Sequence, residues 1–150
     1  MNTADLVREL ADRRTIENAL VAYAHSLDAR DYARLRECLA ADVRVKYGAS
    51  PWLEGIEAVA RFCARFLDPL DATQHRVGSF DVRLQRSRAA SVSYLCAEHL
   101  KSGRRFTLGG RYVDQWTRTP AGWRITQREL AILWTDGDPS VLAGPVPPLE

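Results

Sequence analysis

Apolar residues recur with two different periods along this chain. Between residues 4 and 28 they return every three or four positions, which predicts a long helix with one buried face. A short helix is expected to begin after Asp31, a residue suited to the N-cap position, and a third follows Gly55 and stops at Pro69. The buried face of the long helix comprises Ile16, Leu20, Tyr23, Ala24 and Leu27.

The later part of the chain alternates between apolar and polar positions, which predicts β-strands. A short strand is expected at 43–47, and four long ones at about 74–85, 90–100, 105–118 and 122–135. Since the connections between the long strands are short, we expect hairpins. The order of elements predicts an α+β fold, in which about three helices pack on a strongly curved, mixed or antiparallel sheet that encloses a pocket.

Two local patterns predict irregularities in the long strands. Gly109 and Gly110 lie together in mid-strand, where glycine usually marks a bulge or bend. In the last strand the apolar positions are odd-numbered up to Ile125 and even-numbered from Leu130 onward. A regular strand cannot change parity without an extra residue, so a bulge is predicted within Thr126–Glu129.

The composition is that of a soluble globular domain, with 150 residues, 46% hydrophobic and 27% charged. We expect one domain over residues 1–135, followed by an extended, proline-rich tail over 136–150. The net charge is +2 and the basic residues, nearly all arginine, are spread singly, so we expect no nucleic-acid partner. No segment approaches the ~18 apolar residues of a membrane span, so we expect no membrane partner either.

The cysteines and histidines give no sign of a metal or cofactor. Cys38, Cys63 and Cys96 are far apart and form no CxxC pair, which is typical of reduced thiols and indicates a cytoplasmic protein. The three histidines are scattered, whereas a metal site needs clustered ligands. The chain also has no phosphate-binding glycine loop and no GxSxG nucleophile elbow, so we expect a site without metal or cofactor.

Histidine is the residue type of most chemical interest here, because it titrates near neutral pH. His75 lies near the start of the first long strand, and a hairpin centred on Ser87 would place it almost directly opposite His99, on the same face. Upstream, Tyr23 lies on the apolar face of the long helix and Asp28 at its end. A histidine that only packs in the sheet is the structural alternative.

The layout resembles the SnoaL-like branch of the nuclear transport factor 2-like superfamily, which includes scytalone dehydratase, a bile-acid dehydratase and polyketide cyclases. The resemblance covers residues 15 to 135. It is carried by Ile16-Glu17-Asn18, Tyr23-Ala24, Asp28, Asp31-Tyr32, Gly55-Ile56, Gln74-His75, Gly110-Arg111-Tyr112-Val113-Asp114, Gly122-Trp123-Arg124-Ile125 and Arg128. In this family the fold is a cone-shaped α+β barrel with the active pocket inside.

The resemblance implies catalytic roles for four residues. His75 matches the position of a catalytic histidine in the dehydratases, and we expect it to act as the base. By analogy with scytalone dehydratase we expect His99 to pair with Asp28, although the two histidines could exchange roles. Tyr23 is expected to donate its hydroxyl to a substrate carbonyl and stabilise an enolate.

Four further residues are second-rank candidates for substrate binding, and for each of them a structural role is the simpler interpretation. These are Tyr47, Trp52, Tyr112 and Arg128. From their parity, Glu98 and Asp114 are expected on the opposite face of the sheet, as ion-paired surface or interface groups.

The function expected from the resemblance is a cofactor-independent dehydratase acting on a small, apolar hydroxy-carbonyl compound. An isomerase or cyclase of a polyketide or steroid-like substrate would use the same enolate chemistry. A non-catalytic binding or assembly subunit, like the beta subunits of ring-hydroxylating dioxygenases, is the alternative from another class. Because open sheet edges and backs need cover, we expect a homodimer or homotrimer.

Overall fold

The computed structural model describes residues 1–143 and contains three α-helices, six strands and one 3-10 helix. The expectation of an α+β fold with three helices on a mixed sheet is confirmed. In chain order the elements are α1 (Thr3–Ala29), α2 (Tyr32–Glu37), β1 (Leu39–Tyr47), β2 (Leu53–Glu54), α3 (Ile56–Leu67), β3 (Ala72–Gln85), β4 (Arg88–Lys101), β5 (Arg104–Thr119), β6 (Gly122–Gly137) and η1 (Pro139–Leu142).

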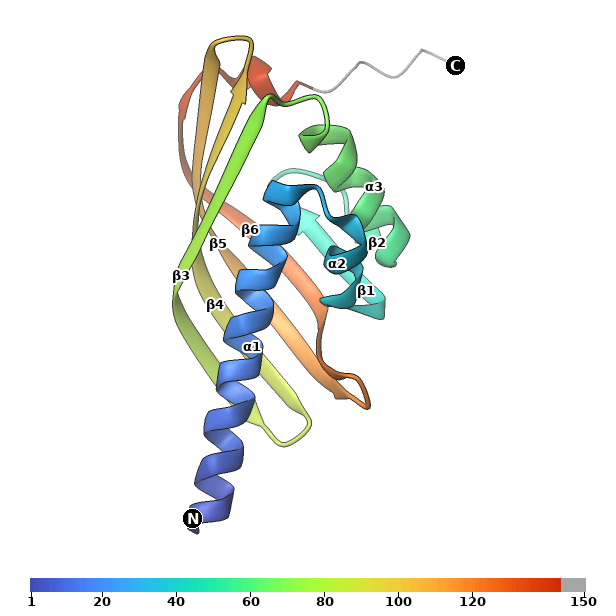
Figure 1. Ribbon diagram of the computed structural model, residues 1–150, viewed down its shortest axis with the longest axis vertical. Coiled ribbons are helices and arrows are strands. Elements are labelled where there is room, and N and C mark those ends of the chain that lie inside the picture. Colours follow the sequence, from blue (N-terminus) through green and yellow to red (C-terminus); the bar gives the residue numbers. More distant parts are fainter. Residues whose placement is uncertain (144–150) are drawn as a thin grey trace.

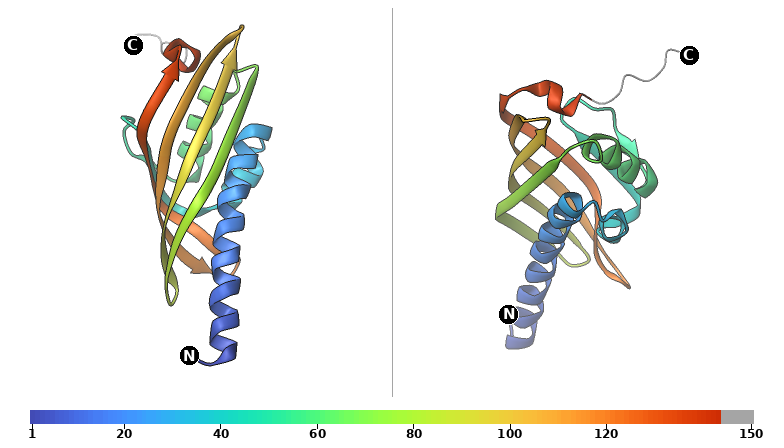
Figure 2. Two further views of the ribbon diagram at one scale, coloured as in Figure 1. Left: turned by 90° about the vertical axis from the view of Figure 1, so that its left-hand side faces the viewer. Right: turned by 45° about the horizontal axis from the view of Figure 1, so that its top comes forward.

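The six strands form one curved sheet in the order β2-β1-β6-β5-β4-β3. All neighbours are antiparallel except β1 and β6, which run parallel. Figure 1 shows α1, α2 and α3 on one side of the sheet, and Figure 2 shows how its long strands curve around them. The core therefore lies between the concave face of the sheet and the helices.

The helix α1 is held at both ends. The side chain of Asn2 caps its start by accepting from the backbone N–H of Asp5, at 2.9 Å. At its C-terminus Arg30 adopts a left-handed conformation, and its guanidinium donates to the backbone carbonyls of Leu67, the last residue of α3, and of Leu70. Because α1 ends against α3, its last turn, with Asp28, is fixed beside the sheet.

A bulge in β3 decides which of its residues face the core. Gly78 lies opposite Tyr94, whereas Asp81 lies opposite Val92, so β3 contains one extra residue, and Ser79 has a positive φ of 51°. Before the bulge the odd-numbered residues of β3 face inward, and after it the even-numbered residues do.

The predicted pairing of the two histidines was wrong by two positions. His75 lies opposite Ala97, and His99 lies opposite Thr73. The turn between Gln85 and Arg88 has two residues, which shifts the register by one position from the prediction. The extra residue of the β3 bulge shifts it by one more. Since two positions keep the parity, both histidines still lie on the inner face, as diagonal neighbours.

Both predicted irregularities of the later strands are present. The bulge in β6 is confirmed, because Trp116 pairs with Ile125 and Gln115 with Gln127, which leaves Thr126 as the extra residue. A second bulge lies at the glycines, since Gly109 pairs with Trp134 and Gly110 with Ile132. Its extra residue, Leu133, is on β6, opposite the glycines and not in their own strand.

The segment after residue 136 contains regular structure, contrary to expectation. The strand β6 continues to Gly137, and the 3-10 helix η1 follows, capped by the Asp138 side chain, which accepts from the Ser140 N–H at 2.9 Å. Val141 is only 2% exposed, so apolar burial holds this turn against the body. The remainder of the expected tail, residues 144–150, lies outside the described residues. Within the described part, no helix is both long and apolar enough to cross a membrane.

Candidate active site

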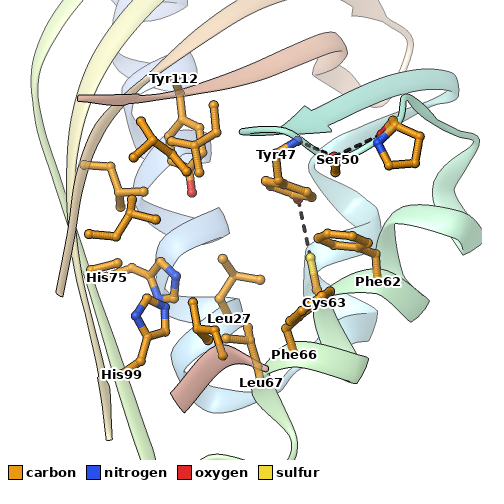
Figure 3. A pocket seen from close by; sticks show the side chains of 17 residues that line it. Leu27, Tyr47, Ser50, Phe62, Cys63, Phe66, Leu67, His75, His99 and Tyr112 are labelled. Atoms are coloured by element: carbon orange, nitrogen blue, oxygen red, sulfur yellow. Dashed lines mark hydrogen bonds between the residues drawn. The ribbon is translucent and has the colours of Figure 1, made fainter. Parts of the chain in front are cut away.

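A cavity of about 450 Å³ lies between the concave face of the sheet and the helices (Figure 3). Most of its wall is aliphatic or aromatic, and the few polar groups are phenols, two imidazoles, a thiol and a hydroxyl. The lining residues are Leu27, Tyr47, Ser50, Pro51, Phe62, Cys63, Phe66, Leu67, His75, Leu95, Ala97, His99, Leu108, Tyr112, Leu130, Ile132 and Leu142.

Asp28 at the end of α1 binds His75 in β3. Its Oδ1 lies 2.7 Å from His75 Nδ1, and its Oδ2 accepts from the His75 backbone N–H at 2.9 Å. A carboxylate can only accept, so Nδ1 carries the hydrogen and the neutral ring keeps the lone pair on Nε2. The expectation that Asp28 pairs with His99 was therefore wrong, because the sheet register brings His75 to the end of α1. The His75 side chain is 7% exposed.

His99 is held by the backbone of β5. Its Nδ1 lies 3.1 Å from the carbonyl oxygen of Phe106, which only accepts, so Nδ1 donates and Nε2 has the lone pair. Burial and the neighbouring His75 lower the pKa of His99 to about 4, so its ring is neutral at physiological pH. The rings of His75 and His99 are perpendicular, with centroids 5.7 Å apart.

Tyr23 does not line the cavity, although sequence analysis placed it there. It is fully buried and its hydroxyl shares a hydrogen bond with the hydroxyl of Tyr47, which does line the cavity. The Tyr47 oxygen is also 3.4 Å from Cys63 Sγ. Burial raises the pKa of both phenols, so both are neutral. Tyr23 thus acts on a ligand indirectly, through the cavity residues that it contacts, Tyr47 among them.

Arg128 lies fully buried behind the cavity wall and does not line it. Its Nε and Nη2 each donate to Asp114, both at 2.8 Å. The guanidinium carbon lies 4.1 Å from the ring centroid of Tyr23 and 3.7 Å from that of Tyr112. Arg128 thus contributes packing and a buried positive charge behind the wall, and a substrate in the cavity does not contact it directly.

The expectation that Asp114 lies on the outer face was wrong. The pairing of β4 with β5 puts the even-numbered residues of β5 on the inner face, and Asp114 is 0% exposed. Its second partner is Ser91, whose hydroxyl also accepts from Trp116 Nε1 at 2.8 Å. Burial raises the pKa of the Asp114 carboxyl, and the Arg128 guanidinium opposes that rise. Glu98 is on the outer face and lies 3.8 Å from Arg105, as expected of an ion pair.

Trp52 is not part of the cavity wall. Its ring lies under the guanidinium of Arg44, 4.7 Å from ring centroid to guanidinium carbon. The aromatic wall that α3 supplies, Phe62 and Phe66, was not predicted from the sequence, because apolar residues at helical spacing are typical of a core. Leu142, which reaches the cavity from η1, was not predicted either.

Residues 1–143 contain no group of three or more His, Cys, Asp or Glu side chains that could hold a metal ion. The polar groups of the cavity are a carboxylate-supported imidazole, a neutral imidazole, phenol hydroxyls, a thiol and a serine hydroxyl, set in an apolar space.

Comparison with solved structures shows a shared fold. A protein of Novosphingobium aromaticivorans named as a candidate scytalone dehydratase has a TM-score of 0.81 and 22% identity, covering 95% of this chain and 97% of its own. The hexachlorocyclohexane dehydrochlorinase LinA type 2 has a TM-score of 0.81 and 16% identity, with coverage of 96% and 98%. A nuclear transport factor 2-like protein with a cystatin-like fold, also of N. aromaticivorans, has a TM-score of 0.76 and 25% identity, with coverage of 95% and 94%.

Sequence comparison finds relatives and a family. An uncharacterized protein of Mycobacterium tuberculosis is 29% identical over 126 residues, which covers 81% of this chain and 86% of the relative. An uncharacterized protein of Mycobacterium bovis matches to the same extent. The model of the SnoaL-like domain matches residues 8–129, which include Asp28, His75 and His99. This chain belongs to the SnoaL-like domain family.

Proposed function

We propose that this protein is a cofactor-independent lyase that removes water from a small, apolar hydroxy-carbonyl compound, with His75 as the general base. The observation that carries the proposal is the Asp28–His75 pair, joined at 2.7 Å in the wall of an apolar cavity of about 450 Å³. Cavities of this size are typical of small-molecule sites. The names of two proteins with this fold, a candidate dehydratase and a dehydrochlorinase, both describe eliminations and support the proposal.

The first step is removal of a proton from the carbon next to the carbonyl. Nε2 of His75 takes the proton, and the electrons of the broken C–H bond pass to the carbonyl oxygen to give an enolate. Asp28 holds the hydrogen on Nδ1 and stabilises the imidazolium that forms. The hydroxyl of Tyr47, with Tyr23 behind it, faces the cavity as one donor for the developing charge.

The second step expels the hydroxyl group from the β-carbon. The enolate re-forms the carbonyl, the C–O bond breaks, and the imidazolium of His75 gives its proton to the leaving oxygen, which departs as water. His99 cannot supply that proton at neutral pH, because its pKa is lowered to about 4 by burial. Its Nε2 can instead accept a hydrogen bond from the substrate hydroxyl. Since one imidazole takes and returns the proton, both groups leave from the same face of the substrate.

Isomerisation or cyclisation would begin with the same enolate. Dehydration is favoured because His99 Nε2 is a hydrogen-bond acceptor, which suits a substrate with a hydroxyl group. An assembly subunit without catalysis would leave the two histidines apart or exposed. Instead, the ring centroids of His75 and His99 are separated by only 5.7 Å, and both rings line the same cavity. This arrangement supports an enzyme.

The test is incubation with a series of β-hydroxy ketones in D₂O. Deuterium entry at the α-carbon, followed by NMR, reports proton abstraction, and absorbance reports the unsaturated product. We expect His75→Ala to lower both rates at least ~10²-fold. His25→Ala, which removes an exposed histidine of α1, is the control and should leave both unchanged. Deuteration that is equally fast without His75 would exclude it as the base.

A further inference from the structure

Tyr112 differs from the other two phenols near the cavity. It is 2% exposed, it lines the cavity from β5, and its oxygen points into the open space (Figure 3). The hydroxyls of Tyr23 and Tyr47 share one hydrogen bond, so each of them already has a partner within the protein. The Tyr112 hydroxyl has no hydrogen-bond partner among residues 1–143. Because this O–H opens onto the cavity and is not used within the protein, a ligand oxygen in the cavity is a favourable acceptor for it.

A cation lies behind the same ring. The guanidinium carbon of Arg128 is 3.7 Å from the ring centroid of Tyr112, and the two bonds to Asp114 fix its plane. The third nitrogen, Nη1, is buried and has no acceptor in the described part of the chain. A cation on the face of a phenol draws electron density from the ring, which makes the O–H a stronger donor. Its charge also stabilises negative charge on an oxygen bound to that O–H.

The charges around Tyr112 favour a neutral but polarised phenol. Burial raises the pKa of Tyr112, so the hydroxyl keeps its proton. Arg128 lowers that pKa, and its effect is larger than the opposing effect of Asp114. The phenol is therefore a donor at physiological pH, strengthened by the buried cation.

We infer that Tyr112 is the hydrogen-bond donor to the substrate carbonyl oxygen, and that Arg128, held by Asp114, is a positioning residue that strengthens this donor. The inference rests on the proposed function and adds a constraint on the substrate. The carbonyl oxygen must reach Tyr112 while the carbon that loses its proton lies at Nε2 of His75. During proton abstraction the Tyr112 O–H bond stays intact, and the negative charge gathers on the substrate oxygen that it binds.

The probe is 2-acetylnaphthalene, an apolar aryl ketone whose methyl group carries exchangeable α-protons. Its carbonyl stretch, measured by infrared difference spectroscopy on the bound ketone, moves to lower wavenumber when the oxygen accepts a hydrogen bond. We expect a large shift with the wild-type protein and the loss of most of it with Tyr112→Phe, together with an affinity loss of about tenfold.

Tyr47→Phe is the matched variant, since it removes the other phenol of the cavity wall. A shift that survives Tyr112→Phe but disappears with Tyr47→Phe overturns the inference. Circular dichroism checks that each variant is folded. Because Arg128 is buried and its replacement can unfold the protein, 3-chlorotyrosine at position 112 provides a second test in the intact site. The more acidic phenol should increase the carbonyl shift, and an unchanged shift contradicts the assigned role.

Failure of this inference and failure of the proposed function give different results. Deuteration of the ketone methyl group in D₂O reports His75, whereas the carbonyl shift reports Tyr112. Deuteration that is lost in His75→Ala, without a Tyr112-dependent shift, supports His75 as the base and rejects the role of Tyr112. A Tyr112-dependent shift without deuteration supports the donor and rejects His75 as the base. Arg128→Lys, if folded, should reduce the shift without abolishing binding, which a purely structural role would not do.

Discussion

Asp28 binds His75 at two points, the ring Nδ1 at 2.7 Å and the backbone N–H at 2.9 Å. One carboxylate therefore fixes both the ring and the strand that carries it. The contact joins the last turn of α1 to the first part of β3, which are far apart in sequence. Orientation of the base and attachment of the strand thus depend on the same side chain.

We expect Asp28→Asn to reduce kcat/KM by about 10³-fold or more while the protein stays folded. The amide can still accept from the backbone N–H of His75, but its NH₂ group facing Nδ1 would favour the tautomer with hydrogen on Nε2. That tautomer has no lone pair toward the cavity. Steady-state kinetics with a turned-over hydroxy ketone measures the effect, and urea unfolding measures stability. Activity close to wild type would show that Asp28 does not set the tautomer.

His99 should make the protein acid-sensitive. Its folded pKa is lowered from 6.5 to about 4, so the unfolded chain binds more protons between these values and stability falls as pH drops through this window. At 1.36 kcal/mol per pKa unit, the loss between pH 7 and pH 4.5 is about 2 to 3 kcal/mol. In His99→Gln, which can still donate to Phe106, we expect this part of the loss to vanish. Urea unfolding at both pH values checks it, and equal losses in the two proteins would contradict it.

Gly110 should not tolerate a side chain. A Cβ there would lie 2.7 Å from the backbone oxygen of Ala131, in the neighbouring strand β6, which cannot move aside without breaking the sheet. We expect Gly110→Ala to destabilise the protein by about 1 to 3 kcal/mol. Gly78→Ala is the matched control, because a Cβ at Gly78 has nothing within 4 Å. The control should be neutral or slightly stabilising, by up to about 1 kcal/mol; thermal melts compare the two.

The buried pair of Arg128 and Asp114 should behave as a unit. We expect Arg128→Met to destabilise the protein by about 3 to 5 kcal/mol, because Asp114 is left buried with an uncompensated charge. Adding Asp114→Leu should restore much of that loss, since no lone charge remains. A double-mutant cycle by chemical unfolding measures the coupling. Additive effects of the two substitutions would show that the pair does not act together.

Sequence patterns predicted the larger features because each rests on many residues. Apolar periodicity identified the long helix and the four long strands, and a parity change located a bulge within Thr126–Glu129, where Thr126 is the extra residue. The same reasoning put His75 and His99 on one face, since an error of two positions keeps parity.

Sequence patterns did not predict the features that depend on a single backbone conformation or on contacts between distant segments. The β3 bulge depends on a left-handed serine, Ser79, and this conformation is uncommon for a residue other than glycine. The partner of Asp28 depends on that register, and the inward direction of Asp114 depends on the pairing of β5 with β4. Leu142 was assigned to an extended tail, because prolines around it obscured a turn that buries its neighbour Val141.

The parallel pairing of β1 with β6 affects when the site forms during folding. Tyr47 can pair with Leu130 only after the chain between them, more than half of the whole, has folded back across the sheet. Closing such a long loop is slow, and proteins dominated by distant pairings fold slowly. Both residues line the cavity, so the cavity is complete only when β6 has docked. An apolar ligand added during refolding should therefore bind in the last kinetic phase, and its binding rate would report the docking of that strand.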